Sequence, residues 1–227
     1  MQRQKRDFNK LLIVEGTDDM FAVIGLMKHH VDWTEEREGW PLWVQQGEGV
    51  TNILKSLYLS TEFKASNIRI VGVILDADDN PQGRYDRIRQ LCLEIFPEIP
   101  AFIPPTGLVV ETSDSLRFGL WVMPDNLSEG TLETFLEQAI PAAQTELWTI
   151  AADCLEHAKN QGASFAKKDE LKARLYTWLA WQHPTGQSAG SAFKSNVFDS
   201  QATYCQPFVR WFCNLFDLAP KSALDQE

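Results

Sequence analysis

The stretch IRIVGVIL at residues 68–75, followed at once by DADDN at residues 76–80, decides the fold that this sequence predicts. The run is almost wholly apolar and rich in β-branched residues, which is typical of a strand covered on both faces of a sheet. Pro81 suits the first turn of a helix, and apolar residues recur at helical spacing from there to Pro97. The segment therefore predicts a central strand that leads, through an acidic turn, into a helix.

Two similar units precede this segment. The run LLIV at residues 11–14 ends in Glu15-Gly16 and predicts a buried strand with a tight turn, after which residues 18–30 have helical spacing. A short strand over residues 42–44 and a helix over residues 51–62 form the second unit. Three strand–helix units in succession predict an α/β fold, with a mostly parallel sheet flanked by helices and joined by right-handed crossovers.

The rest of the chain has a different pattern. Residues 107–122 predict a hairpin with a short polar loop, and residues 131–140 predict a helix. Beyond them apolar residues recur at helical spacing, most clearly over residues 205–216. We therefore predict a sheet domain over residues 1–140 and a helical extension over residues 141–227 that packs on it. The Phe and Trp residues of the extension favour a core over a platform for stacking bases.

The composition is that of an ordinary globular protein, with 44% hydrophobic and 23% charged residues among 227. No run approaches the roughly 18 apolar residues of a membrane span, and the basic, polar N-terminus lacks the apolar segment of a secretory signal. The four Cys residues have no CxxC spacing, which excludes the common zinc motifs and indicates buried thiols in a reducing compartment. We expect a cytoplasmic protein with no membrane partner.

The formal net charge is −10. This charge argues against sequence-independent coating of nucleic acid, which needs a basic surface. It leaves open an enzyme that reaches phosphates through a bound divalent metal. The sequence has no glycine-rich phosphate loop of the GxxxxGK[ST] kind, so we do not expect the chain itself to hydrolyse ATP.

Acidic residues follow two of the predicted strands. Glu15 comes directly after the first strand, and Asp76 and Asp78 come after the central one. Because the carboxyl ends of parallel strands meet at one edge of a sheet, we expect these side chains in one crevice. An extended backbone beyond Asp76 would put Asp76 and Asp78 on the same side. Asp19 lies early in the helix after Glu15 and could face the same crevice.

Such a cluster favours a metal ion. Carboxylates held together without a basic partner raise each other's pKa and cost stability, which a divalent cation relieves. Hard oxygen ligands without Cys or His favour Mg²⁺, or Mn²⁺, over zinc. Two such ions about 4 Å apart would stabilise the attacking and the leaving oxygen of a phosphodiester. The sequence therefore predicts a catalytic metal site formed by Glu15, Asp19, Asp76 and Asp78.

Both acidic motifs resemble those of Toprim domains, which occur in topoisomerases, bacterial primases and overcoming-lysogenisation-defect (OLD) nucleases. LIVEGTDD at residues 12–19 is similar to the first motif, and VILDAD at residues 73–78 is similar to the second, a strand followed by Asp-x-Asp. The resemblance implies a Toprim/Rossmann-like sheet in which Glu15 acts in acid–base chemistry or metal binding and the Asp-x-Asp pair binds Mg²⁺. The OLD-like layout also implies a nucleic acid substrate and a separate ATPase partner.

Further charged residues are candidates for secondary roles. In the nuclease branch, downstream acids help to form a second metal site, and the resemblance gives Asp125, Glu129 and Glu133 as the candidates here. Glu129 and Glu133 would be i, i+4 neighbours on one helical face, although a solvated acidic helix N-terminus also explains them. Arg84 and Arg87, on the helix after the Asp-x-Asp pair, are either phosphate contacts or solvated surface residues.

Three functions remain open. The first is a Mg²⁺-dependent Toprim nuclease, or a related phosphodiester-processing enzyme, that acts on DNA or RNA. The second is a non-catalytic Toprim-like module that binds a metal, a nucleotide or a partner protein. The third is a Mg²⁺-dependent phosphatase or sugar-nucleotide enzyme that uses the Asp-x-Asp pair alone. The first hypothesis requires that Glu15 and Asp76 meet, with no basic side chain in the space between them.

Overall fold

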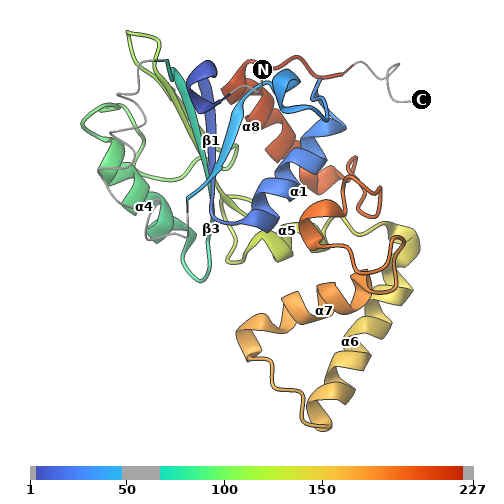
Figure 1. Cartoon of the computed structure of the whole chain (residues 1–227). Helices are drawn as coiled ribbons and strands as arrows, with labels where there is room; N and C mark the ends of the chain where they lie inside the picture. The colour runs from blue at the N-terminus through green and yellow to red at the C-terminus, as the bar shows by residue number, and fades with distance from the viewer. Residues whose placement is uncertain (1–3, 48–66, 222–227) are drawn as a thin grey trace.

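The computed structural model describes residues 4–47 and 67–221, which contain a five-stranded sheet of order β2-β1-β3-β5-β4 (Figure 1). The parallel strands are β1 (Lys10–Val14), β2 (Trp43–Gln46), β3 (Ile70–Asp76) and β5 (Arg117–Met123). The edge strand β4 (Leu108–Glu111) runs antiparallel to β5 and forms the predicted hairpin with it. The predicted α/β fold class is confirmed, while the helix predicted over residues 51–62 lies outside the described residues.

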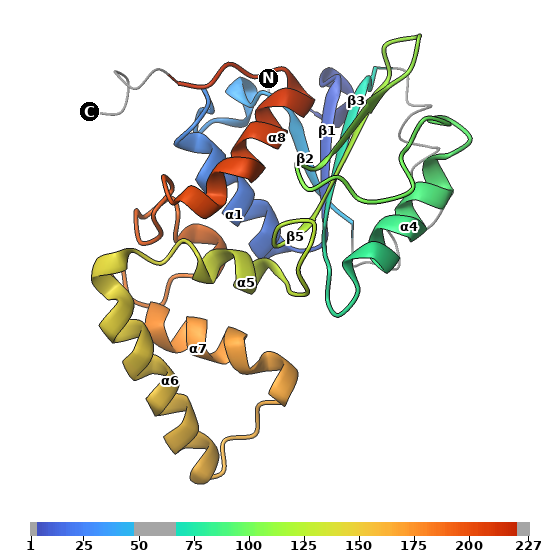
Figure 2. The same cartoon turned by 180° about the vertical axis from the view of Figure 1, so that it is seen from behind.

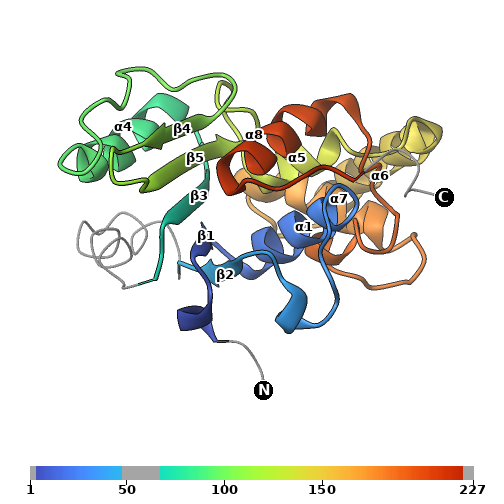
Figure 3. The same cartoon turned by 90° about the horizontal axis from the view of Figure 1, so that it is seen from above.

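Helices cover both faces of this sheet. α1 (Thr17–Lys28) and α8 (Gln206–Phe216) lie on one face and α4 (Pro81–Cys92) on the other, and the view from above shows the same layers (Figure 3). The side chains of β1 alternate between the two cores. Leu12 and Val14 belong to the core that contains α1 and α8. Leu11 and Ile13 belong to the core under α4. This burial on both sides explains why the strand is continuously apolar.

α8 lies close to the centre of the sheet because two strands carry glycine beneath it. Gly72 of β3 and Gly119 of β5 are partners in the strand register. A Cβ on Gly119 would lie 2.4 Å from Leu215 Cδ2, and one on Gly72 would lie 2.7 Å from Phe216 Cζ. The two glycines therefore form the surface on which the last helix of the chain packs.

Three further helices lie between the hairpin and α8. α5 (Leu132–Glu137) sits next to the sheet, while α6 (Thr145–Asn160) and α7 (Glu170–Leu179) extend away from it (Figure 2). No helix of the described ranges is long and apolar enough to cross a membrane. Single turns of 3-10 helix lie at Lys5–Asp7, Arg37–Gly39, Ala142–Gln144, Lys167–Asp169, Ala189–Ser191 and Thr203–Cys205.

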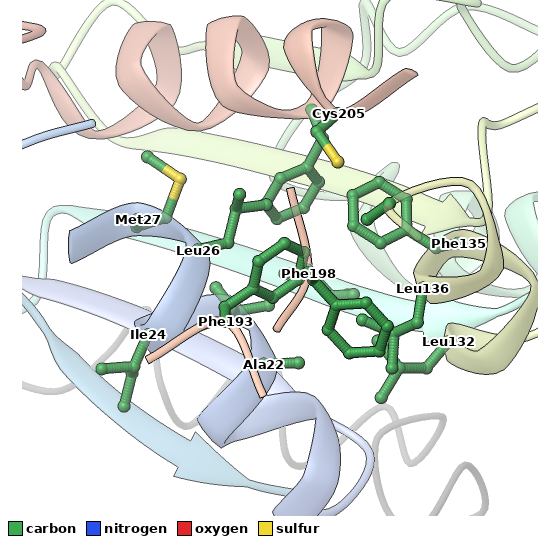
Figure 4. Packing of buried hydrophobic residues seen from close by; sticks show 14 of the residues in the cluster. Ala22, Ile24, Leu26, Met27, Leu132, Phe135, Leu136, Phe193, Phe198 and Cys205 are labelled. Atoms are coloured by element: carbon green, nitrogen blue, oxygen red, sulfur yellow. The ribbon is translucent and has the colours of Figure 1, made fainter. Parts of the chain in front are cut away.

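One hydrophobic core joins the sheet to the second half of the chain. Leu26 of α1, Phe135 of α5 and Phe193, which precedes α8, are all buried in it (Figure 4). Side chains from both sides of residue 140 thus share this core. The domain boundary that the sequence predicts there stays a prediction.

Candidate active site

Glu15 and Asp76 come together at the carboxyl edge of the sheet. Glu15 follows β1 directly and Asp76 ends β3, and these two strands are parallel neighbours. The backbone N–H of Asp76 donates a hydrogen bond to Glu15 Oε1 at 3.3 Å. Two acids that are 61 positions apart in the sequence therefore meet, because parallel strands end at the same edge.

The turn at Gly16 places Asp19 at the start of the next helix. Gly16 caps α1, and its backbone N–H donates to Asp19 Oδ2 at 3.1 Å. A Cβ on Gly16 would lie 3.2 Å from that oxygen, so glycine allows this close approach. Asp19 is 9% exposed, and its Oδ1 has no hydrogen-bond partner. A buried carboxylate oxygen without a donor is costly, and a bound cation would satisfy it.

The N-terminus of α5 contacts the same acids. The backbone N–H of Leu132 donates to Asp76 Oδ1 at 2.8 Å. The next residue, Glu133, accepts a hydrogen bond from Thr131 Oγ1 at 2.7 Å through Oε2, and its Oε1 lies 3.1 Å from Lys172 Nζ. Of the three candidates for a second metal site, Glu133 is the one that lies beside the strand-end acids.

A cleft of about 250 Å³ lies where the strand ends, α5 and α7 meet. Asp19 and Asp76 line it. Glu133, Lys168 and Lys172 line it as well. The cleft therefore combines carboxylates with ammonium groups, and these come from distant parts of the chain.

The two lysines are functional candidates that the sequence analysis missed. Lys168 precedes α7 and Lys172 lies in its first turn. The stretch KKDELK at residues 167–172 has the mixed charge of an ordinary solvated helix start, so no sequence signal separates these lysines from others. The hydroxyl of Tyr176 on the same helix donates to Asp18 Oδ2 at 2.8 Å, which joins α7 to the start of α1.

The side chains of Asp76 and Asp78 bond to different partners. An extended backbone would have put both side chains on the same side. Asp78 has a left-handed φ of 52°, and its backbone N–H and carbonyl both bond to Gly130, at 2.9 and 2.8 Å. Its side chain is 56% exposed and forms an ion pair with Arg84. Arg84 Nη2 also lies 4.0 Å from Glu15 Oε1. The prediction that the acids cluster without a basic partner is therefore wrong for Asp78.

The remaining sequence candidates do not line the cleft. The carboxylate of Asp125 accepts hydrogen bonds from the turn that follows it and from the Tyr204 hydroxyl at 3.0 Å, so it stabilises a loop. Glu129 is exposed and precedes α5, which contradicts the predicted helical pair with Glu133. Arg87 is exposed on α4.

Burial changes the protonation of the strand-end acids. It raises the pKa of Asp76 to about 8, of Glu15 to about 7 and of Asp19 to about 6, and neighbouring carboxylates add to each shift. For Glu15, the Arg84 guanidinium and the hydrogen bond from the Asp76 N–H act in the opposite direction. Near neutral pH Asp76 therefore retains its proton, and Glu15 titrates, unless a cation replaces the protons.

The pKa of Glu133, which lines the same cleft, shifts in the other direction. Burial would raise its pKa, but hydrogen bonding from Thr131 and the charge of Lys172 outweigh burial and lower the pKa. Glu133 is therefore ionised under conditions in which the strand-end acids hold protons.

The donor atoms suit a hard divalent cation, since they are carboxylate oxygens and Asp19 Oδ1 lacks a partner. They are not gathered around one point. In residues 4–47 and 67–221, no group of three or more Asp, Glu, His or Cys side chains is arranged to hold a metal ion. The contacts explain this, because Lys172 holds Glu133 and Arg84 holds Asp78. A metal ion would have to compete with these partners.

Comparisons relate the chain to known proteins. No curated protein matches it. Among solved structures, the C-terminal region of the Burkholderia pseudomallei OLD protein is similar at 17% identity and a TM-score of 0.47, over 92% of this chain and 98% of that one. A TM-score below 0.5 does not establish a shared fold, so the Toprim resemblance stays a prediction. A family model described as a protein of unknown function (DUF3226) matches residues 9–217, and the chain therefore belongs to this family.

Proposed function

We propose that this protein is a Mg²⁺-dependent phosphodiester-processing enzyme, and specifically a nuclease. The observation that carries the proposal is the cleft that Asp19 and Asp76 line together with Lys168 and Lys172. Carboxylates without cations would repel a phosphate, and lysines without carboxylates would not hold a metal. The two together can bind a divalent cation and a phosphate side by side.

The contacts support a separate role for each group. Asp19, Asp76 and Glu133 would supply the oxygen ligands of the ion, which when bound polarises the phosphoryl group and stabilises its developing charge. The two lysines of the cleft orient the phosphate by charge. Glu15, whose pKa burial raises to about 7, is suited to take the proton of the attacking water.

The substrate class and the partner rest on the Toprim resemblance. It gives DNA or RNA as the substrate and a separate ATPase as the partner protein. A net charge of −10 is compatible with a substrate that is reached at one cleft and not held along a broad basic surface.

The test compares metal binding with cleavage. Labelled single- and double-stranded DNA and RNA are incubated with the protein in Mg²⁺, Mn²⁺ or EDTA, and Mn²⁺ binding is measured by calorimetry. Asp76→Asn removes a charge at the cleft, whereas Asp114→Asn makes the same change in the exposed loop between β4 and β5. We expect metal-dependent cleavage by the unchanged protein and by Asp114→Asn, and loss of both activities in Asp76→Asn. Cleavage that persists in EDTA would contradict the proposal.

One observation favours a non-catalytic module instead. In the described residues the acids of the site are not gathered around one point, and Glu15, Asp78 and Glu133 already have cationic partners. Binding of Mn²⁺ without cleavage of any nucleic acid would support that role. The contacts do not support the third hypothesis, a phosphatase or sugar-nucleotide enzyme that uses the Asp-x-Asp pair alone. Asp76 and Asp78 bond to different partners.

A further inference from the structure

Arg84 is a buried cation inside the acidic site. It lies on α4 and is 9% exposed, and its guanidinium contacts Asp78 Oδ2 and lies 4.0 Å from Glu15 Oε1. We propose that this guanidinium takes the position of a second cation, so that the site binds one divalent ion and not two. The inference rests on the metal dependence proposed above.

The start of α4 holds Arg84 in this position. Asn80 caps the helix, since its Oδ1 accepts a hydrogen bond from the Gly83 N–H at 2.8 Å and its carbonyl accepts one from the Arg84 N–H at 3.0 Å. A Cβ on Gly83 would lie 2.6 Å from Asn80 Nδ2, so this tight cap requires glycine. A guanidinium is weakly hydrated and always charged, which makes it a suitable permanent cation at a buried site.

Arg84 divides the acids into two groups. Glu15 and Asp78 face the guanidinium. Asp19 and Asp76 line the cleft, where Asp19 Oδ1 has no partner. The charge that still lacks a cation is therefore on the cleft side, and this is where one ion would bind.

The charge balance also favours a single ion. Arg84 and Lys172 already offset part of the charge of the carboxylates. A second divalent ion would have to enter beside the guanidinium, and like charges a few ångströms apart repel strongly in a partly buried site. Its ligands would be Glu15 and Asp78, the carboxylates that Arg84 faces. We therefore expect a second ion site to open when the guanidinium is removed.

Ion stoichiometry tests this inference. Mn²⁺ bound per chain is measured by isothermal titration calorimetry, and pairs of close ions are detected by electron paramagnetic resonance. We expect one ion in the unchanged protein and a spin-coupled pair in Arg84→Gln. The double variant Arg84→Gln/Asp78→Asn also loses a ligand of the second ion and returns to one. Arg87→Gln makes the matched change at an exposed position of α4 and keeps one ion.

Two close ions in the unchanged protein would overturn the inference, and so would a single ion in folded Arg84→Gln. If circular dichroism shows that Arg84→Gln does not fold, Arg84→Lys replaces it. That variant retains a cation, so one ion supports the inference and a pair overturns it. A protein that binds no ion at all gives a different result, because it contradicts the proposed metal-dependent function itself.

Discussion

The two walls of the cleft differ in origin and in charge. We call them the strand-end wall, which consists of the lining residues Asp19 and Asp76 with Glu15 bonded behind them, and the helical wall, formed by Glu133, Lys168 and Lys172. Burial raises the pKa of each acid in the first wall, whereas the second wall contains an ionised carboxylate and more exposed lysines. The residues of the strand-end wall that line the cleft are acids, and the lysines that line it come from the helical wall. The proposed site therefore depends on both halves of the chain.

The largest effect is expected from Asp19→Asn, which removes an ionisable group from the strand-end wall. Cleavage of nucleic acid should fall by on the order of 10²-fold or more, the scale at which loss of a charge-stabilising group reduces an enzymatic rate. The free energy of unfolding should not fall, because the amide oxygen of Asn can keep the hydrogen bond from the Gly16 N–H and Oδ1 of the carboxylate has no partner to lose. Single-turnover cleavage and urea denaturation measure the two quantities. A less stable Asp19→Asn would show that the side chain supports the fold instead.

Stability in EDTA should depend on pH through the strand-end wall. Asp76 has a pKa of about 8 in the folded chain against an ordinary value of 3.8, so the folded state keeps a proton that the unfolded state releases. The free energy of unfolding should therefore decrease as pH rises from about 4 to about 8, by on the order of a few kcal/mol at most. Denaturation at several pH values measures this slope.

Asp76→Asn is the control for this pH dependence. The variant cannot titrate, so its slope should be shallower than that of the unchanged protein or of Asp114→Asn. Addition of Mg²⁺ near pH 8 should restore stability to the unchanged protein and to Asp114→Asn, but not to Asp76→Asn. An equal slope in Asp76→Asn would show that other groups determine the pH dependence.

The strand-end wall could be predicted from the sequence, and the helical wall could not. The stretch at residues 68–75 and the acids after it gave the sheet and the meeting of Glu15 with Asp76, because parallel strands end at one edge. Lys168 and Lys172 reach the cleft through the packing of α7, which depends on contacts between segments far apart in the chain. The spacing of residues within a helix does not predict such contacts.

Asp78 shows a second limit of the sequence pattern. Alternation along a strand predicted that it would share a side with Asp76, but its left-handed φ of 52° ends the alternation. The hydrogen bonds with Gly130 fix this conformation, and Gly130 belongs to the loop between β5 and α5. The glycines under α8 are a signal that could have been used, since Gly72 and Gly119 interrupt strands at the place where side chains of α8 pack closely on the sheet.

A smaller effect is expected from Lys172→Gln, which removes a charge from the helical wall. The KM for nucleic acid should rise by about tenfold, or about 1.4 kcal/mol, with a weaker dependence on salt. Mn²⁺ affinity should not decrease, because the change frees Glu133 from its ion pair. Lys167→Gln makes the matched change at an exposed position nearby and should have little effect. Reduced Mn²⁺ affinity with an unchanged KM would mean that Lys172 supports metal binding and does not bind the substrate.

The smallest effect is expected from Tyr176→Phe, which deletes a contact between α7 and the start of α1. The lost hydrogen bond to Asp18 Oδ2, 2.8 Å long, should lower the free energy of unfolding by about 1 kcal/mol. Because α7 carries Lys172, loss of this contact should also raise the KM slightly. In the double variant Tyr176→Phe/Lys172→Gln, the two increases in KM should not add. The lysine whose position Tyr176 fixes is absent from that variant. Fully additive KM effects in the double variant would mean that Tyr176 stabilises the fold without setting the spacing between the walls.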